Sequence, residues 1–162
     1  MLSEAQQRRV WEGMLGAEIR AYYFADLSSR LYARQKWSTW AILLLTSGSA
    51  ATVLASLPSD WTWIRIPFTL LAAAISLYSA IMQSQKFAVD ASDLHARWQR
   101  LSKDYEALWE NVYVEDAVER LRSLDDRAVE VSKAGTIFRY NKKAMLKWEQ
   151  HVVSYRLANA PA

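Results

Sequence analysis

Hydrophobic residues are distributed very unevenly along this chain of 162 residues. Two apolar runs without charged residues, 37–57 and 66–85, are separated by a short turn segment, residues 58–65, and the regions on either side are densely charged. About 20 apolar residues form a helix long enough to cross the roughly 30 Å hydrocarbon core of a bilayer. The pattern therefore predicts two transmembrane helices joined by a periplasmic turn.

The first charged flank, residues 1–36, shows the periodicity of a helix. Ser3 and Gln6 have capping-box spacing, so a helix is predicted to begin there. Apolar residues then recur at helical spacing and predict the buried face: Trp11, Leu15, Ile19, Tyr22, Leu27 and Leu31. The pattern predicts a cytoplasmic amphipathic helix that packs on a partner, and an interfacial membrane anchor is the alternative.

The second charged flank, residues 86–162, predicts further helices. An unbroken heptad seam extends the second membrane helix as a stalk: Phe87, Ala91, Leu94, Trp98, Leu101, Tyr105, Leu108 and Val112. A third helix is predicted over residues 115–134, ending at Gly135 in the C′ position, with an apolar line at Ala117, Leu121, Leu124, Ala128 and Val131. A fourth helix is predicted after a cap at Thr136 or Asn141, with a seam at Met145, Trp148, Val152 and Tyr155.

Basic residues determine the predicted orientation. They gather before the first apolar run and after the second, whereas the turn between the runs has Arg65 alone. Because cytoplasmic segments carry the excess of positive charge, both termini are predicted to be cytoplasmic. The predicted fold is an all-α membrane protein, a two-helix transmembrane hairpin whose long helices extend into a cytoplasmic helical bundle.

Composition argues against several function classes. The net charge of +3 is spread over surfaces of mixed sign, so no nucleic-acid partner is predicted. The chain has no cysteine, which removes disulfides and thiolate chemistry. His95 and His151 lack the spacing of a metal pair and are predicted to be structural, and the acidic residues of the third helix alternate with basic ones as on a solvated face. No metal, cofactor or catalytic residue is predicted, and the protein is not expected to be an enzyme.

The densest basic cluster follows the third helix and consists of Arg139, Lys142, Lys143 and Lys147. One interpretation is a binding patch for an anionic lipid, a nucleotide or an acidic partner. The alternative, which the sequence favours, is electrostatic pairing with the acidic third helix across an antiparallel bundle.

Small and polar residues within the apolar runs have two interpretations. Small residues at helical spacing favour close helix packing, with Gly48 and Thr52 in the first run and Ala72 and Ala80 in the second. A polar line in the second run could instead face water in an oligomeric pore: Thr69, Ser76, Ser79 and Gln83.

Two stretches beside the apolar runs carry a family resemblance. The first stretch, residues 31–37, reads LYARQKW. In the second stretch, residues 94–101 read LHARWQRL and lead into residues 105–110, which read YEALWE. With two adjacent apolar runs and a helical tail, this pattern resembles the SLATT superfamily over nearly the whole chain. The resemblance implies an effector of bacterial conflict and defence systems in the inner membrane. Such an effector would form a homo-oligomeric pore in the lipid bilayer and permeabilise it. Its trigger would be a nucleotide second messenger or a separate sensor protein. The alternative function is a non-conducting membrane scaffold that recruits a cytoplasmic partner through its helical bundle.

Overall fold

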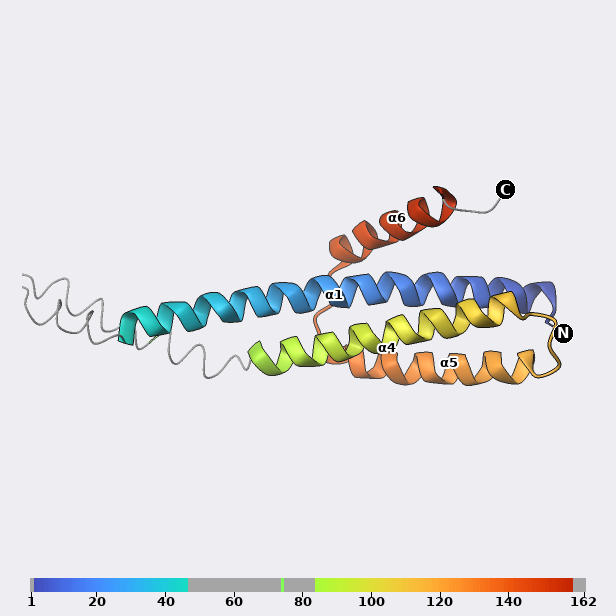
Figure 1. Cartoon of the computed structure of the whole chain (residues 1–162), viewed down its shortest axis with the longest axis horizontal. Helices are drawn as coiled ribbons and strands as arrows, with labels where there is room; N and C mark the ends of the chain where they lie inside the picture. The colour runs from blue at the N-terminus through green and yellow to red at the C-terminus, as the bar shows by residue number, and fades with distance from the viewer. Residues whose placement is uncertain (1, 47–73, 75–83, 159–162) are drawn as a thin grey trace, which may run out of the picture. The chain divides into compact units, whose positions relative to one another are not determined.

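A computed structural model describes residues 2–46, 74 and 84–158 (Figure 1). These residues are helical almost throughout. The elements are α1 (Glu4–Thr46), α4 (Ser84–Glu110), α5 (Ala117–Ala134), the short 3-10 helix η2 (Gly135–Ile137) and α6 (Lys142–Ala158). The chain divides into two compact units, and the first comprises Met1–Ser28 and Asp90–Ala162. The second is Ser29–Val89.

Two predicted helix starts are confirmed by their side-chain caps. The backbone N–H of Ser3 donates to Gln6 Oε1 at 2.9 Å, and the N–H of Gln6 donates to Ser3 Oγ at 3.4 Å, which completes the capping box. At the start of α6 the N–H of Ala144 donates to Asn141 Oδ1 at 3.2 Å. The cap is therefore Asn141, because the hydroxyl of Thr136 donates backwards to the Lys133 carbonyl at 2.7 Å.

The seam of α4 is confirmed from Ala91 to Val112. Its members are at most 9% exposed: Ala91, Leu94, Trp98, Leu101, Tyr105, Leu108 and Val112. The prediction is wrong at the first position, since Phe87 is 38% exposed and Ala88 is buried instead. The apolar line of α5 is also buried, except that Ala128 is only half-buried.

The predicted buried face of α1 is wrong. Trp11 and Tyr22 are exposed, and the buried positions follow a different heptad line: Val10, Met14, Ala17, Ala21, Phe24 and Ser28. The prediction followed the largest apolar side chains, but the buried line includes the small residues Ala17, Ala21 and Ser28, which let two helices approach closely. The aromatic rings lie at the margins of that contact, where Trp11 meets Trp109 with ring centroids 5.4 Å apart.

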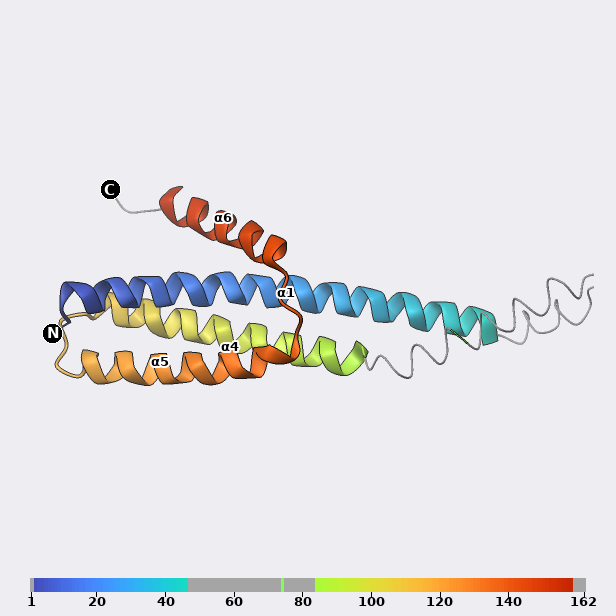
Figure 2. The same cartoon turned by 180° about the vertical axis from the view of Figure 1, so that it is seen from behind.

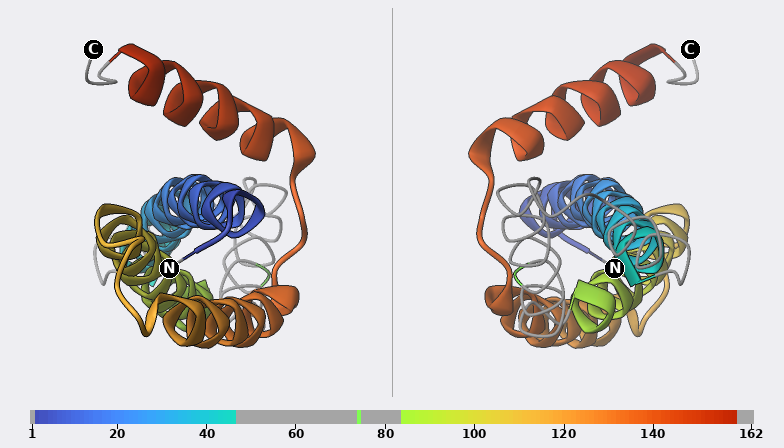
Figure 3. Two further views of the ribbon diagram at one scale, coloured as in Figure 1. Left: turned by 90° about the vertical axis from the view of Figure 1, so that its right-hand side faces the viewer. Right: turned by 90° about the vertical axis from the view of Figure 1, so that its left-hand side faces the viewer.

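Within the first unit, α5 and α6 lie on opposite sides of α1 (Figures 1, 2 and 3). The predicted seam of α6 is confirmed at Val152, which is 1% exposed, whereas Tyr155 is 57% exposed. Arg156 is half-buried beside it. At the N-terminal end of α1, the N–H of Leu2 donates to the Val112 carbonyl at 3.1 Å, which attaches the start of the chain to the turn after α4.

The predicted membrane hairpin is contradicted. Among the described residues, no helix is both long enough and apolar enough to cross a membrane. The described part of the first apolar run, residues 37–46, would extend only about 15 Å as a helix. Residues 47–73 and 75–83, which hold most of both predicted spans, lie outside the described residues. The fold class is therefore corrected to an all-α helical bundle, as far as the chain is described.

In the second unit, the described residues belong mainly to the end of α1 and the beginning of α4. Trp37 is 77% exposed and Trp40 is 55% exposed. A cavity of about 420 Å³ is lined in part by Trp40, Gln35 and Gln85. The hydroxyl of Thr39 donates to the Gln35 carbonyl at 3.0 Å. This bond lies within α1 and does not connect two helices.

Candidate functional site

A cavity of the first unit has a volume of about 600 Å³ and borders all of its helices. Residues of α1, α4, α5, η2 and α6 line it, and many of the side chains are aromatic: Tyr23, Phe24, Trp98, Phe138 and Tyr140. Small-molecule sites commonly have volumes of about 300–1,000 Å³ and mostly apolar walls with a few polar groups. In size and lining, this cavity can accept a small ligand.

Close packing of η2 on α1 shapes one wall of the cavity. A Cβ atom at Gly135 would lie 3.3 Å from Cζ of Phe24, so a larger residue would displace that ring. Gly135 has φ −73°, a right-handed conformation open to any residue, and the prediction that it is a C′ residue is wrong. The glycine is required here for space. Phe24 in turn packs edge-on against Phe138, with ring centroids 5.8 Å apart.

Arg20 and Trp98 both line this cavity. Arg20 places its guanidinium carbon 5.0 Å from the ring centroid of Trp98 and donates one N–H to the Gly16 carbonyl at 2.9 Å. Trp98 is 3% exposed, and its Nε1 is buried without a hydrogen-bond partner among the described residues. A buried donor left unpaired costs about 1–3 kcal/mol, so this N–H is a position where an acceptor would stabilise the protein.

The segment between η2 and α6 is tied to α1 by Tyr23. The Tyr23 hydroxyl donates to the Arg139 carbonyl at 3.4 Å and accepts the N–H of Asn141, also at 3.4 Å. Both bonds are long and therefore weak. They nevertheless fix where the basic cluster begins relative to the cavity.

The predicted basic cluster is exposed at the start of α6. Within the described part of the chain, Arg139, Lys142, Lys143 and Lys147 make no ion pair, and Lys147 lies 4.9 Å from the ring centroid of Trp148. The acidic third helix pairs elsewhere. Asp125 of α5 contacts Arg9 of α1 at 2.7 Å, and Arg127 of α5 contacts Asp104 of α4 at 2.7 Å. The predicted pairing of this cluster with α5 is therefore not observed among the described residues.

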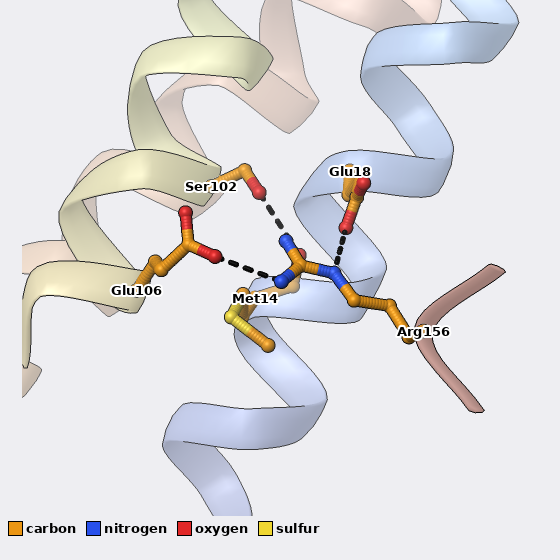
Figure 4. A network of polar contacts seen from close by, with 5 residues as sticks. All are labelled: Met14, Glu18, Ser102, Glu106 and Arg156. Atoms are coloured by element: carbon orange, nitrogen blue, oxygen red, sulfur yellow. Dashed lines mark hydrogen bonds and ion pairs between the residues drawn. The ribbon is translucent and has the colours of Figure 1, made fainter. Parts of the chain in front are cut away.

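A second polar site holds α6 against the bundle (Figure 4). Arg156 Nε lies 3.0 Å from a carboxylate oxygen of Glu18, and Arg156 Nη1 lies 2.8 Å from one of Glu106. The two acids come from α1 and α4, so the planar guanidinium joins three helices. Hydrogen bonding to Glu106 raises the pKa of Arg156 despite its partial burial, which keeps the charge in place.

Aromatic contacts and one further polar bond surround this clasp, by which we mean Arg156 with Glu18 and Glu106. Tyr22 of α1 stacks on Trp148 of α6, with centroids 5.4 Å apart and planes 11° apart. His151 meets the edge of the same Tyr22 ring at 5.8 Å. His95 Nδ1 lies 2.9 Å from the Ala21 carbonyl. Both histidines thus take part in packing, as expected of structural residues.

None of the clasp residues was singled out as a site by the sequence. Glu18 and Arg156 lie 138 positions apart and Glu106 and Arg156 lie 50 apart, so no local spacing connects them. The predicted pore-lining residues Thr69, Ser76, Ser79 and Gln83 lie outside the described residues. So do the predicted packing residues Gly48, Thr52, Ala72 and Ala80.

Neither a protein-family model, nor a curated protein, nor a solved structure matches this chain. The resemblance to the SLATT superfamily stays a prediction from the quoted sequence stretches.

Proposed function

We propose that this chain is a non-enzymatic scaffold that assembles with copies of itself by exchanging α6 between bundles. The observation that supports the proposal is the way α6 is held. Val152 is the one buried residue among the described residues of α6, yet Arg156 is fixed between carboxylates of two other helices. The attachment is small in area and specific in chemistry, which suits an element that can leave one bundle and enter another.

Exchange would preserve the contacts of α6. In a swapped pair, each α6 offers Arg156 and Trp148 to the Glu18, Glu106 and Tyr22 of the other copy, and only the connecting segment, residues 138–141, changes course. Domain swapping is a low-cost route to dimers for this reason. The short connection between η2 and α6 also favours it, because short hinge loops promote exchange.

The outward side of α6 gives a second reason for assembly. Leu146 is 44% exposed, Val153 is 38% exposed and Leu157 is 73% exposed. Positions separated by seven and four residues lie on one side of a helix, so these side chains form an apolar stripe along α6. Association of copies could remove part of this stripe from water.

Complementary charge reversal tests the exchange directly. One variant carries Arg156→Glu, and the other carries Glu18→Arg together with Glu106→Arg. Each reversal breaks the clasp within its own chain, so we expect rapid amide hydrogen exchange across α6 in either variant alone. In a mixture of the two variants, the bundle of each variant finds an α6 of complementary charge only on the other variant. We therefore expect a one-to-one complex of about twice the 18.6 kDa chain mass, with α6 protected again.

The matched control is Arg122→Glu, which reverses an exposed arginine of α5. This variant should keep α6 protected and should gain no complex when mixed with Arg156→Glu. Light scattering and native mass spectrometry give the masses. A wild-type chain that stays monomeric at every concentration, together with no complex on mixing the reversed pair, would contradict the proposal.

The pore-forming function implied by the SLATT resemblance stays a prediction, as does placement at a bacterial inner membrane. The residues on which that activity would depend lie outside the described part of the chain. Ion flux on overexpression distinguishes it from the scaffold, because a scaffold leaves the membrane potential unchanged and an open pore collapses it.

A further inference from the structure

The aromatic cavity described above is a second candidate site, and α6 forms part of its wall. The cavity has a volume of about 600 Å³, and residues from every helix of the first unit line it. Phe24 and Phe138 meet edge to face at 5.8 Å, and Tyr140 lines the same space. Faces and edges of this kind favour a flat aromatic ligand, which can stack or pack edge-on against them.

Polar groups at the cavity indicate the charge of the ligand. Arg20 uses one N–H on the Gly16 carbonyl and makes no ion pair within the described residues, so other guanidinium donors are available. The neighbouring Trp98 has a buried N–H without an acceptor there. An anionic oxygen in the cavity would be attracted by the guanidinium of Arg20.

We propose that this cavity binds a small aromatic anion, with its rings against Phe24 and Phe138 and its anionic group at Arg20. Glu149 of α6 also lines the cavity and is exposed. Its carboxylate would repel an anion, so the anionic group is assigned to the side formed by α1 and α4. The cavity is complete in a monomer, and an exchange of α6 would replace Met145 and Glu149 in its lining by the same residues of the other copy.

Two fluorescent probes of nearly the same shape test the assignment. Anilinonaphthalene sulfonate is an aromatic anion, and N-phenylnaphthylamine has the same two ring systems without the sulfonate. We expect the wild-type chain to bind one sulfonate probe saturably. Arg20→Gln should weaken that binding roughly tenfold, as for the loss of one charge-assisted hydrogen bond, and should leave the neutral probe unaffected. Arg122→Gln is the control for net charge and should change neither affinity.

Glu149→Gln locates the anionic group within the cavity. We expect this variant to bind the sulfonate probe as tightly as the wild type or more tightly. Weakening as large as that of Arg20→Gln would overturn the assignment, as would equal loss of both probes in Arg20→Gln. Absence of saturable binding to the wild type would overturn the proposal as a whole. Thermal unfolding of each variant confirms that the bundle is intact.

The indole signal of Trp98 in a proton–nitrogen NMR spectrum provides a readout that does not depend on affinity. It is identified as the indole cross-peak missing from Trp98→Phe. Titration with the sulfonate probe should move this cross-peak, because Trp98 lines the cavity and its ring lies beside Arg20. An unmoved cross-peak at saturation would overturn the placement of the anionic group beside Arg20.

Discussion

The contact between α1 and α4 predicts opposite effects on stability when alanine replaces each of two nearby glycines, Gly13 and Gly16. An added Cβ atom at Gly13 would lie 2.8 Å from Cε1 and 2.9 Å from Cζ of Tyr105. Tyr105 is 2% exposed, and its hydroxyl donates to Asp125 at 2.8 Å. Asp125 is itself held by Arg9 at 2.7 Å. The ring is therefore fixed at both ends and cannot move aside without losing a hydrogen bond.

The magnitude for Gly13→Ala follows from opposing effects. Alanine gains up to about 1 kcal/mol over glycine in a helix interior. Overpacking a close contact costs about 1–3 kcal/mol, and displacing the hydroxyl from a carboxylate costs about 1.5–3 kcal/mol more when fully buried. Because the side chain of Asp125 is 24% exposed, the lower part of that range applies. We expect a net loss of about 1–3 kcal/mol and a fall in Tm of about 2–12 °C.

Gly16→Ala is the matched control, three positions along the same helix. Its Cβ atom would lie 3.0 Å from Nη1 of Arg20, the mobile end of an exposed side chain. The guanidinium can move away, so the helix preference dominates, and stability should stay the same or rise by up to about 1 kcal/mol. Thermal and urea unfolding followed by circular dichroism measure both variants. A Gly13→Ala protein as stable as Gly16→Ala would refute the argument that Tyr105 cannot yield.

Three further predictions concern other parts of the bundle. Tyr105→Phe should cost about 1–2 kcal/mol near neutral pH. Burial, with its hydrogen bond to a carboxylate, raises the pKa of Tyr105. The stabilisation by the Tyr105 hydroxyl is therefore present below the unfolded pKa of about 10 and is lost as the pH rises above it. In urea titrations at alkaline pH, the difference in the free energy of unfolding between wild type and Tyr105→Phe should shrink, and a larger difference would contradict this reasoning. Leu101→Asp should cost several kcal/mol in urea unfolding, whereas Val129→Asp, at a position 54% exposed, should cost little, and equal losses would contradict the observed seam. Arg156→Gln should accelerate amide exchange across α6 while leaving α4 protected, and unchanged exchange would show that α6 does not depend on the clasp.

The sequence predicts helices better than it predicts which sides of them meet. The seam of α4 is correct because its large apolar residues are also its buried ones, from Leu94 to Leu108. On α1 the two properties separate. Ala17 and Ala21 are buried because they are small enough for a close helix contact. The larger Tyr22 stays 39% exposed, although one face of its ring stacks on Trp148 of α6. Hydrophobicity alone ranks these positions in the wrong order.

The candidate sites were beyond sequence reasoning for a related reason. Arg156 looks like any surface arginine until folding brings Glu18 and Glu106 to it from two other helices. The unpaired N–H of Trp98 likewise depends on every neighbour around it. The predicted membrane span that includes residues 37–46 is also wrong. Hydropathy marks this apolar run as long enough to cross a bilayer, but the described helix contains too little of the run to do so.

The long separation in sequence between α1 and α4 has a consequence for synthesis of the chain. Ser102 and its acceptor, the Met14 carbonyl, lie 88 positions apart. At about 5–20 residues per second, a ribosome needs about 4–18 s between making the two. During that interval the apolar side of the first helix has nothing of its own chain to cover it. The nascent protein should therefore engage chaperones early, and slowing translation between these two positions should increase its degradation or aggregation.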